Sequence, residues 1–185
     1  MIKVLFIIWS LEKGGAERFL ASLLENIDLD KIEPTLCCLN WKGEWASVVE
    51  GQGIKIFELN KNSGFDLRAF IRLIKIVHEG NYTIVNTHLW TADVLGRLAA
   101  FICRVPIVIS TAQNVDIWKK WWHRLIDKIL SYRTDKIIAV SEAVKDYYHK
   151  KVGIRDKKIM VIPNAIDIDK YEKNQDSYYL YHEFK

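Results

Sequence analysis

Seven short, mainly apolar runs that alternate with helical patterns constrain the fold of this chain more than any other feature. Apolar runs of this length are typical of strands buried on both faces. Strands that alternate with helices lie parallel and are joined by right-handed crossovers. The sequence therefore predicts an α/β domain with a Rossmann-like, mostly parallel sheet and helices on both faces. The predicted strands are residues 2–8, 34–39, 54–59, 82–87, 105–110, 136–140 and 159–162.

The stretches between these strands carry apolar residues at the spacing of one helix face, which predicts the sides that pack on the core. The helix that Asp66 caps has the stripe Phe70, Leu73, Ile74 and Val77. The helix after the fourth strand has the stripe Val94, Leu95, Leu98, Ala99 and Ile102.

Length and composition exclude several classes of protein. The chain has 185 residues and is 50% hydrophobic, enough for one domain with its own core. No apolar run reaches the roughly 18 residues that span a bilayer, and the N-terminus lacks a signal-peptide cleavage site. The three cysteines have no metal-ligand spacing, so we expect buried thiols in a reducing cytoplasm and neither a metal nor a cofactor. The net charge of +4 does not by itself indicate nucleic acid.

The stretch from Trp9 to Arg18 is a predicted strand-to-helix turn. Its two glycines, Gly14 and Gly15, stand where the backbone is expected to bend and to be approached closely. Free N–H groups at the start of the helix form a natural anion site at the carboxyl edge of the sheet. The turn has neither a Walker-type Lys-Ser or Lys-Thr nor a dinucleotide Gly-x-Gly-x-x-Gly fingerprint. Glu17 either orders the turn, reaches the ligand or favours the helix dipole.

Four stretches fall at the carboxyl ends of predicted strands, namely residues 14–18, 87–93, 140–143 and 161–167. Their order and spacing resemble the N-terminal, acceptor-side domain of family 4 glycosyltransferases, the retaining enzymes of the GT-B fold. The resemblance covers about residues 2–171. It implies transfer of a sugar from a nucleotide-sugar donor to a cell-surface glycan or a lipid-linked acceptor.

The resemblance also implies roles for individual residues. Gly14 and Gly15 would approach the donor diphosphate and the transferred sugar, and His88 would contact that sugar near the reaction centre. Ser141 would line the interdomain cleft, and Asn164 would stand at the crossing into a second domain. This chain has Gln113 where many members have histidine, and Ala165 where the family usually has glycine. Asp93, with Thr91, is read first as a helix cap.

A GT-B enzyme places its active site between two domains, and the resemblance covers only the first. We therefore expect a glycosyltransferase domain over residues 1–170 and a linker, the start of a missing C-terminal domain, over 171–185. The expected chain is a half-enzyme that is inactive alone, or one whose C-terminal domain comes from a partner chain. Two alternatives stay open: a non-catalytic module that docks through the open interdomain face, and a flavodoxin-like enzyme that binds phosphate at the glycine turn.

Residues 118–124 interleave three tryptophans with basic groups. Tryptophan rings favour the headgroup region of a bilayer and cations attract anionic lipid. This predicts an anionic membrane contact, at the inner face of the plasma membrane, through Trp118, Lys119, Lys120, Trp121 and Trp122. In the alternative interpretation, Trp118, Trp122, Leu125 and Ile129 are the core face of a helix over 117–133. Binding of single-stranded nucleic acid would need aromatic platform strands as well, so we expect no nucleic-acid partner.

Overall fold

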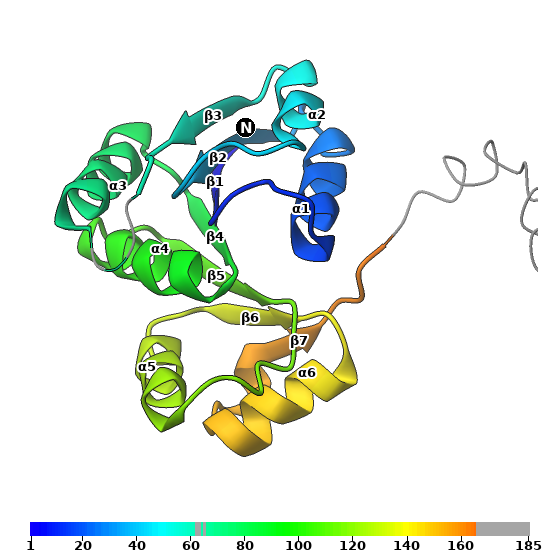
Figure 1. Ribbon diagram of the computed structural model, residues 1–185, viewed down its shortest axis with the longest axis vertical. Helices are drawn as coiled ribbons and strands as arrows, with labels where there is room; N and C mark the ends of the chain where they lie inside the picture. The colour runs from blue at the N-terminus through cyan, green and yellow to red at the C-terminus, as the bar shows by residue number, and fades with distance from the viewer. Residues whose placement is uncertain (62–63, 65, 166–185) are drawn as a thin grey trace, which may run out of the picture.

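The computed structural model describes residues 1–61, 64 and 66–165, and its centre is one seven-stranded sheet in which every neighbouring pair is parallel (Figure 1). The strand order is β3-β2-β1-β4-β5-β6-β7, so the chain runs outward from β1 in one direction and then from β4 in the other. The predicted fold class is confirmed. The strands are β1 (Ile2–Ile8), β2 (Ile32–Cys38), β3 (Lys55–Glu58), β4 (Ile84–His88), β5 (Ile107–Ala112), β6 (Lys136–Ala139) and β7 (Ile159–Val161).

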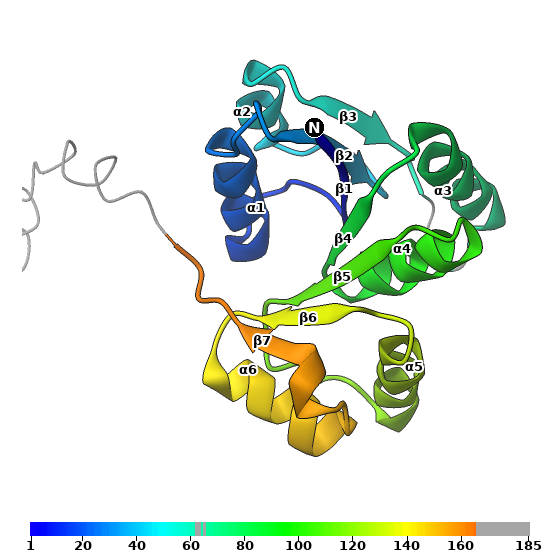
Figure 2. The ribbon, with the colours of Figure 1, turned by 180° about the vertical axis from the view of Figure 1, so that it is seen from behind.

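Helical segments connect consecutive strands. They are α1 (Gly15–Glu25), α2 (Ala46–Gly51), α3 (Leu67–Gly80), α4 (Trp90–Ile102), α5 (Trp121–Ser131) and α6 (Glu142–Asp146), which continues as a π-helical turn, η1 (Tyr147–Val152). A 3₁₀ turn, η2 (Asp156–Lys158), precedes β7. Figure 2 shows the same arrangement from behind, with α1 and α2 on one side of the β1–β3 region and α3 and α4 on the other.

Three clusters of buried side chains show which helices cover which face of the sheet. One cluster joins α1 and α2 to Phe6 and Ile8 of β1. A second joins α3 and α4 to the alternate residues of the central strands, including Val108 of β5. The third joins α6 and η1 to Ala112 and to β6. Val108 and Ala112 are four residues apart on one strand and so share a face. Hence α3, α4 and α6 cover one face, and α1 and α2 cover the other.

The apolar stripe of α3 was predicted correctly, that of α4 in part, because Ala99 is buried and Leu95 packs on the core, and that of α5 wrongly. In α3 the buried residues are Ala69, Leu73 and Val77, and Asp66 caps the helix by accepting a hydrogen bond from the Ala69 N–H (3.0 Å). The buried residues of α4 include Asp93 and Arg97, whereas Leu98 and Ile102 are exposed. In α5 the buried residues are His123, Asp127, Leu130 and Ser131. The interpretation of Trp118, Trp122, Leu125 and Ile129 as a core face is therefore wrong, because all four are exposed.

The expected boundary at residue 170 and the expected linker over 171–185 lie outside the described residues. Among the helices of the described part of the chain, none is long and apolar enough to cross a membrane.

Candidate functional site

The candidate site lies at the carboxyl edge of the sheet, beside the neighbouring strands β1 and β4. From β1 successive strands are added on one side, and from β4 on the other. Open α/β sheets bind ligands at such switch points because the loops after the two strands diverge there. Two hollows adjoin at this edge and share Leu89, Gln113 and Asn114. The first, which we call the tryptophan hollow, has a volume of about 390 Å³. The second, the α1 hollow, has a volume of about 360 Å³.

The tryptophan hollow combines aromatic faces with hydrogen-bonding groups. Trp9, Trp90 and Trp118 supply the rings, and Trp90 packs edge-on against Trp118 with ring centroids 5.8 Å apart. The Trp90 Nε1 atom is buried and has no hydrogen-bond partner among the described residues. Buried donors are normally paired, so this N–H is available to a ligand or a water. The remaining lining residues are Leu89, Thr91, Asp93, Ser110, Thr111, Ala112, Gln113, Asn114, Asp116 and Tyr148.

Leu89 connects β4 to α4 in a backbone conformation that side chains rarely adopt. Its φ is 63° and its ψ is 142°, and it stands at the N-cap position of α4. Such strained backbone costs of order 1–3 kcal/mol and persists where the surrounding structure holds it. The conformation places Leu89 in the wall between the two hollows. The strain thus falls at the candidate site rather than in a remote loop.

The glycine turn differs in detail from the expectation. Neither Gly14 nor Gly15 has a positive φ, so neither is required by backbone conformation. Gly14 is crowded, because a Cβ there would lie 2.1 Å from the Glu17 carboxylate, and a larger residue would have to displace this flexible side chain. Gly15 faces open space and lines the α1 hollow together with Glu17. Glu17 therefore packs against the turn and also lines the hollow.

Gln113 and Asn164 come from distant parts of the chain and meet at the α1 hollow. The Asn164 side-chain amide donates a hydrogen bond to Gln113 Oε1 over 3.0 Å. The Gln113 Nε2 atom is buried and unpartnered within the described chain. This pair joins the loop after β5 to the segment after β7, and it leaves one amide donor for a ligand.

His88 lies beneath the hollows and lines neither of them. Its side chain is 1% exposed, and its ring is 6.4 Å from that of Phe6, centroid to centroid. Burial lowers the pKa of His88 to about 4, so the ring is neutral at pH 7. Neither ring nitrogen has a hydrogen-bond partner among the residues that the structure describes. A neutral ring suits a hydrogen bond to a sugar hydroxyl better than stabilisation of a developing charge.

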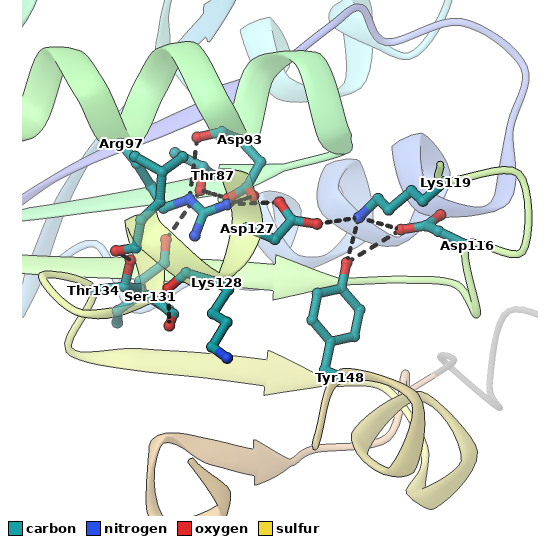
Figure 3. A network of polar contacts seen from close by, with 12 residues as sticks. Thr87, Asp93, Arg97, Asp116, Lys119, Asp127, Lys128, Ser131, Thr134 and Tyr148 are labelled. Carbon is teal, nitrogen blue, oxygen red and sulfur yellow. Dashed lines mark hydrogen bonds and ion pairs between the residues drawn. The ribbon is translucent and has the colours of Figure 1, made fainter. Parts of the chain in front are cut away.

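Figure 3 shows a buried ion network that includes two residues of the tryptophan hollow, Asp93 and Tyr148. Arg97 pairs with Asp93 and, over 3.2 Å, with Asp127. Lys119 contacts the other Asp127 oxygen at 2.8 Å and donates to the Tyr148 hydroxyl at 2.9 Å. Asp93 and Tyr148 also line the hollow, so the network fixes part of its wall.

The network sets the orientation of α5 and corrects one predicted membrane contact. Lys119 is buried and also pairs with Asp116 at 2.7 Å, so it is not available to a lipid surface. Burial raises the pKa of Asp127, although Lys119 and Arg97 oppose that rise. Burying a charge without a partner is costly, so the face of α5 that carries Asp127 must turn inward to Arg97 and Lys119.

The remaining predicted site residues have structural roles or stay untested. Ser141 caps α6, because its hydroxyl oxygen accepts a hydrogen bond from the Val144 N–H at 3.3 Å, and it lines neither hollow. Within residues 1–61, 64 and 66–165, no group of three or more His, Cys, Asp or Glu side chains could hold a metal ion.

The sequence analysis did not predict three residues that line the tryptophan hollow, Trp9, Trp90 and Asn114. All three follow the ends of strands, and this position could have marked them as candidates. That they line the same hollow depends on the order of the strands in the sheet, which the sequence pattern does not contain.

The fold and the site together define the class: a Rossmann-like half of a GT-B protein, with its hollows at the switch point. The chain belongs to Glycosyltransferase Family 4, whose family model matches residues 13–170.

Two curated relatives are bacterial glycosyltransferases. The Escherichia coli UDP-Gal:alpha-D-GlcNAc-diphosphoundecaprenol alpha-1,3-galactosyltransferase is 29% identical over 116 residues, which cover 57% of this chain and 29% of that protein. The Staphylococcus aureus capsular polysaccharide biosynthesis glycosyltransferase CapM is 28% identical over 58% of this chain and 30% of that protein. The chain thus spans less than a third of the length of these two relatives.

Solved structures show the same fold. Anabaena HepE in complex with UDP superposes with a TM-score of 0.76 at 23% identity, over 92% of this chain and 46% of that one. A glycosyltransferase from Rickettsia africae gives a TM-score of 0.74 at 19% identity, over 97% of this chain and 48% of that one.

Proposed function

We propose that this chain is the acceptor-side half of a retaining glycosyltransferase that moves a sugar from a nucleotide-sugar to a glycan or lipid-linked acceptor. One observation carries the proposal: the tryptophan hollow and the α1 hollow adjoin at Leu89, Gln113 and Asn114. A transferase needs two substrates side by side, with the transferred group at the boundary between them. Two adjoining hollows at a switch point provide that geometry.

The tryptophan hollow is the proposed acceptor site. A sugar ring presents C–H groups on its faces and hydroxyls at its rim, so it suits a pocket with aromatic walls and a few polar groups. Trp9 and Trp90 offer such walls, and Thr91, Asn114 and Asp116 offer hydrogen-bonding groups. The acceptor of the E. coli relative is a sugar carried on diphosphoundecaprenol, according to its name. We therefore propose a lipid-linked saccharide as acceptor.

The α1 hollow is the proposed contact for the donor. Backbone N–H groups at the start of α1 attract a diphosphate, and the missing side chain of Gly15 leaves room for it. In the described part of the chain, no basic side chain lines this hollow. A diphosphate leaving group needs positive charge, so the remaining positive groups come from a second domain or from a partner chain. Gln113 and Asn164 are proposed donor contacts, and the neutral His88 is proposed to hydrogen-bond to the transferred sugar.

Titration of the purified chain with defined probes tests the assignment of the tryptophan hollow to the acceptor and of the α1 hollow to the donor. The probes are UDP-glucose, UDP-galactose and N-acetylglucosamine diphosphate on a short prenyl chain. We expect the prenyl-linked sugar to bind, the nucleotide-sugars to bind weakly, and no sugar to be transferred. Thr91→Ala and Asn114→Ala should weaken acceptor binding. Trp41→Ala, which removes an exposed ring outside both hollows, should leave it unchanged.

The outcomes separate the proposal from its rivals. Binding of no probe would favour a non-catalytic docking module. Firm binding of a nucleotide-sugar, or transfer of labelled sugar by the chain alone, would contradict the half-enzyme. An immunoblot of source cells supplies an independent check, because two domains of this size give a band of roughly twice the 21.6 kDa of this chain.

A further inference from the structure

The outward side of α5 is apolar, although the helix packs on the protein through polar residues. Trp121 is 70% exposed and Ile129 is 56% exposed. These two residues belong to what we call the α5 apolar face, which consists of Trp118, Trp121, Trp122, Leu125, Ile129 and Tyr132. The positions from 121 to 132 recur at three- and four-residue spacing and therefore form one stripe, and Trp118 lies just before the helix. Exposed apolar patches of this kind mark interaction surfaces.

The exposed charged side chains of α5 and of the residues beside it, from 117 to 133, are all basic. Lys120, Lys128 and Arg133 are exposed and Arg124 is partly exposed. Residues 90–133, which include α4 and α5, contain only three acidic residues: Asp93, Asp116 and Asp127. All three are engaged in the buried network with Arg97 and Lys119. The network therefore pairs all three acids of residues 90–133 and leaves the exposed basic side chains without an acid among these residues.

Neighbouring elements extend the same pattern. On α4, which packs beside α5, Leu98 and Ile102 are exposed. Arg104 follows at the end of that helix and is also exposed. In Figures 1 and 2, α5 lies on the opposite side of the molecule from residues 162–165, where the described chain ends. Helix α4 therefore adds exposed apolar and basic side chains beside α5, away from the point where the described chain ends.

We infer that the α5 apolar face docks the domain onto an anionic lipid bilayer. Tryptophan and tyrosine rings partition to the headgroup region, and leucine and isoleucine side chains enter the adjoining acyl layer. Lysine and arginine at the border meet anionic headgroups, each contributing about a fivefold gain in affinity. A protein partner would need acidic residues placed opposite these basic side chains, whereas an anionic bilayer attracts them without specific contacts. The inference does not depend on glycosyl transfer.

Vesicle co-sedimentation of the full 185-residue chain tests the inference. The vesicles are phosphatidylglycerol with phosphatidylethanolamine in one arm and phosphatidylcholine alone in the other. We expect binding to the anionic vesicles that weakens with added salt, and at least about tenfold weaker binding to phosphatidylcholine. Trp121→Ser should weaken binding about tenfold, because an exposed ring that the bilayer would bury is lost. Lys128→Glu should weaken it by at least about tenfold, because two units of charge are lost.

Matched variants on α3 serve as controls. Ile71→Ser removes an exposed apolar residue, and Lys75→Glu reverses an exposed charge, both away from α5. Both should bind anionic vesicles like the parent chain, and circular dichroism should show that all four variants are folded. The inference is overturned if the parent binds neither vesicle, or if the α5 variants bind as well as the α3 controls. It is also overturned if the parent forms a dimer that Trp121→Ser dissociates and vesicles fail to bind, because a second copy then covers the face.

Discussion

Helix α3 packs on the protein through apolar side chains alone, whereas the pair α4–α5 also buries an ion network. The inward side of α3 carries Leu73 and Val77, and its outward side carries mainly charged residues. The inward sides of α4 and α5 include the charged residues Arg97 and Asp127 beside small and apolar ones, and their outward sides carry leucine, isoleucine and tryptophan. Solvation alone favours the first arrangement. The second needs a strong inward interaction, here a closed ion network, and an outward environment that accepts apolar side chains.

The largest expected effect comes from breaking that network. Arg97→Met leaves the buried Asp93 without its cation and Asp127 with only Lys119. Removing one partner of a buried ion pair costs about 3–5 kcal/mol of the free energy of unfolding. Urea denaturation measures the loss. Arg72→Met on α3 is the matched control, because Arg72 is exposed and donates one hydrogen bond, to the Leu59 carbonyl. The contrast between the helices disappears if the two variants lose equal stability.

A pair of leucine truncations tests the two faces directly. Leu73→Ala on α3 should lower the free energy of unfolding by about 2–5 kcal/mol, because it opens a cavity in the core. Leu125→Ala on α5 should change it by no more than about 0.5 kcal/mol, since that side chain is exposed. Thermal or urea unfolding of both variants gives the comparison. A loss above about 2 kcal/mol in Leu125→Ala would show that the α5 apolar face is covered in solution.

The sequence predicts the sheet and α3 well because local patterns determine both. An apolar run or an inward leucine is recognisable from its neighbours alone. The orientation of α5 was not predictable in this way, because Asp127 turns inward to meet Arg97, 30 residues earlier, and Tyr148 of η1 reaches the same network. The apolar stripe of α5 is real, but periodicity reports a stripe and not the side to which it faces.

The candidate site also has some features that the sequence predicts and others that depend on how side chains are arranged in space. The glycine turn was predicted because it follows a strand, and parallel strands end at one edge; Gln113 and Asn164 were predicted from the family resemblance, and the structure places both at the α1 hollow. The crowding of Gly14 by Glu17 and the convergence of three tryptophans depend on side-chain positions that no local pattern contains.

A pH titration separates His88 from the ion network. The pKa of His88 is about 4 in the folded chain and ordinarily 6.5, so the unfolded state binds a proton first as pH falls. Stability is therefore lost as pH drops from 6.5 toward 4, by about 2 kcal/mol between pH 7 and pH 5. Asp127 acts in the opposite direction, because its pKa is raised by burial and protonation favours the folded state. His88→Gln should flatten this dependence in urea unfolding, whereas His78→Gln on α3, where the ring is exposed, should preserve it.

The smallest expected effect concerns two helix caps, one on α3 and one on α6. Asp66 caps α3 and Ser141 caps α6, each through a side-chain oxygen that accepts a backbone N–H. Asp66→Ala and Ser141→Ala should each cost about 1 kcal/mol, and Ser141→Asp should retain the stability because aspartate caps equally well. A cap needs only an oxygen acceptor, whereas a residue that lines the interdomain cleft must also suit the substrate. If Ser141→Asp folds as stably as the parent and binds the prenyl-linked sugar equally well, capping accounts for Ser141. A variant that is stable but binds that sugar poorly would instead assign Ser141 to the cleft, as the resemblance implies.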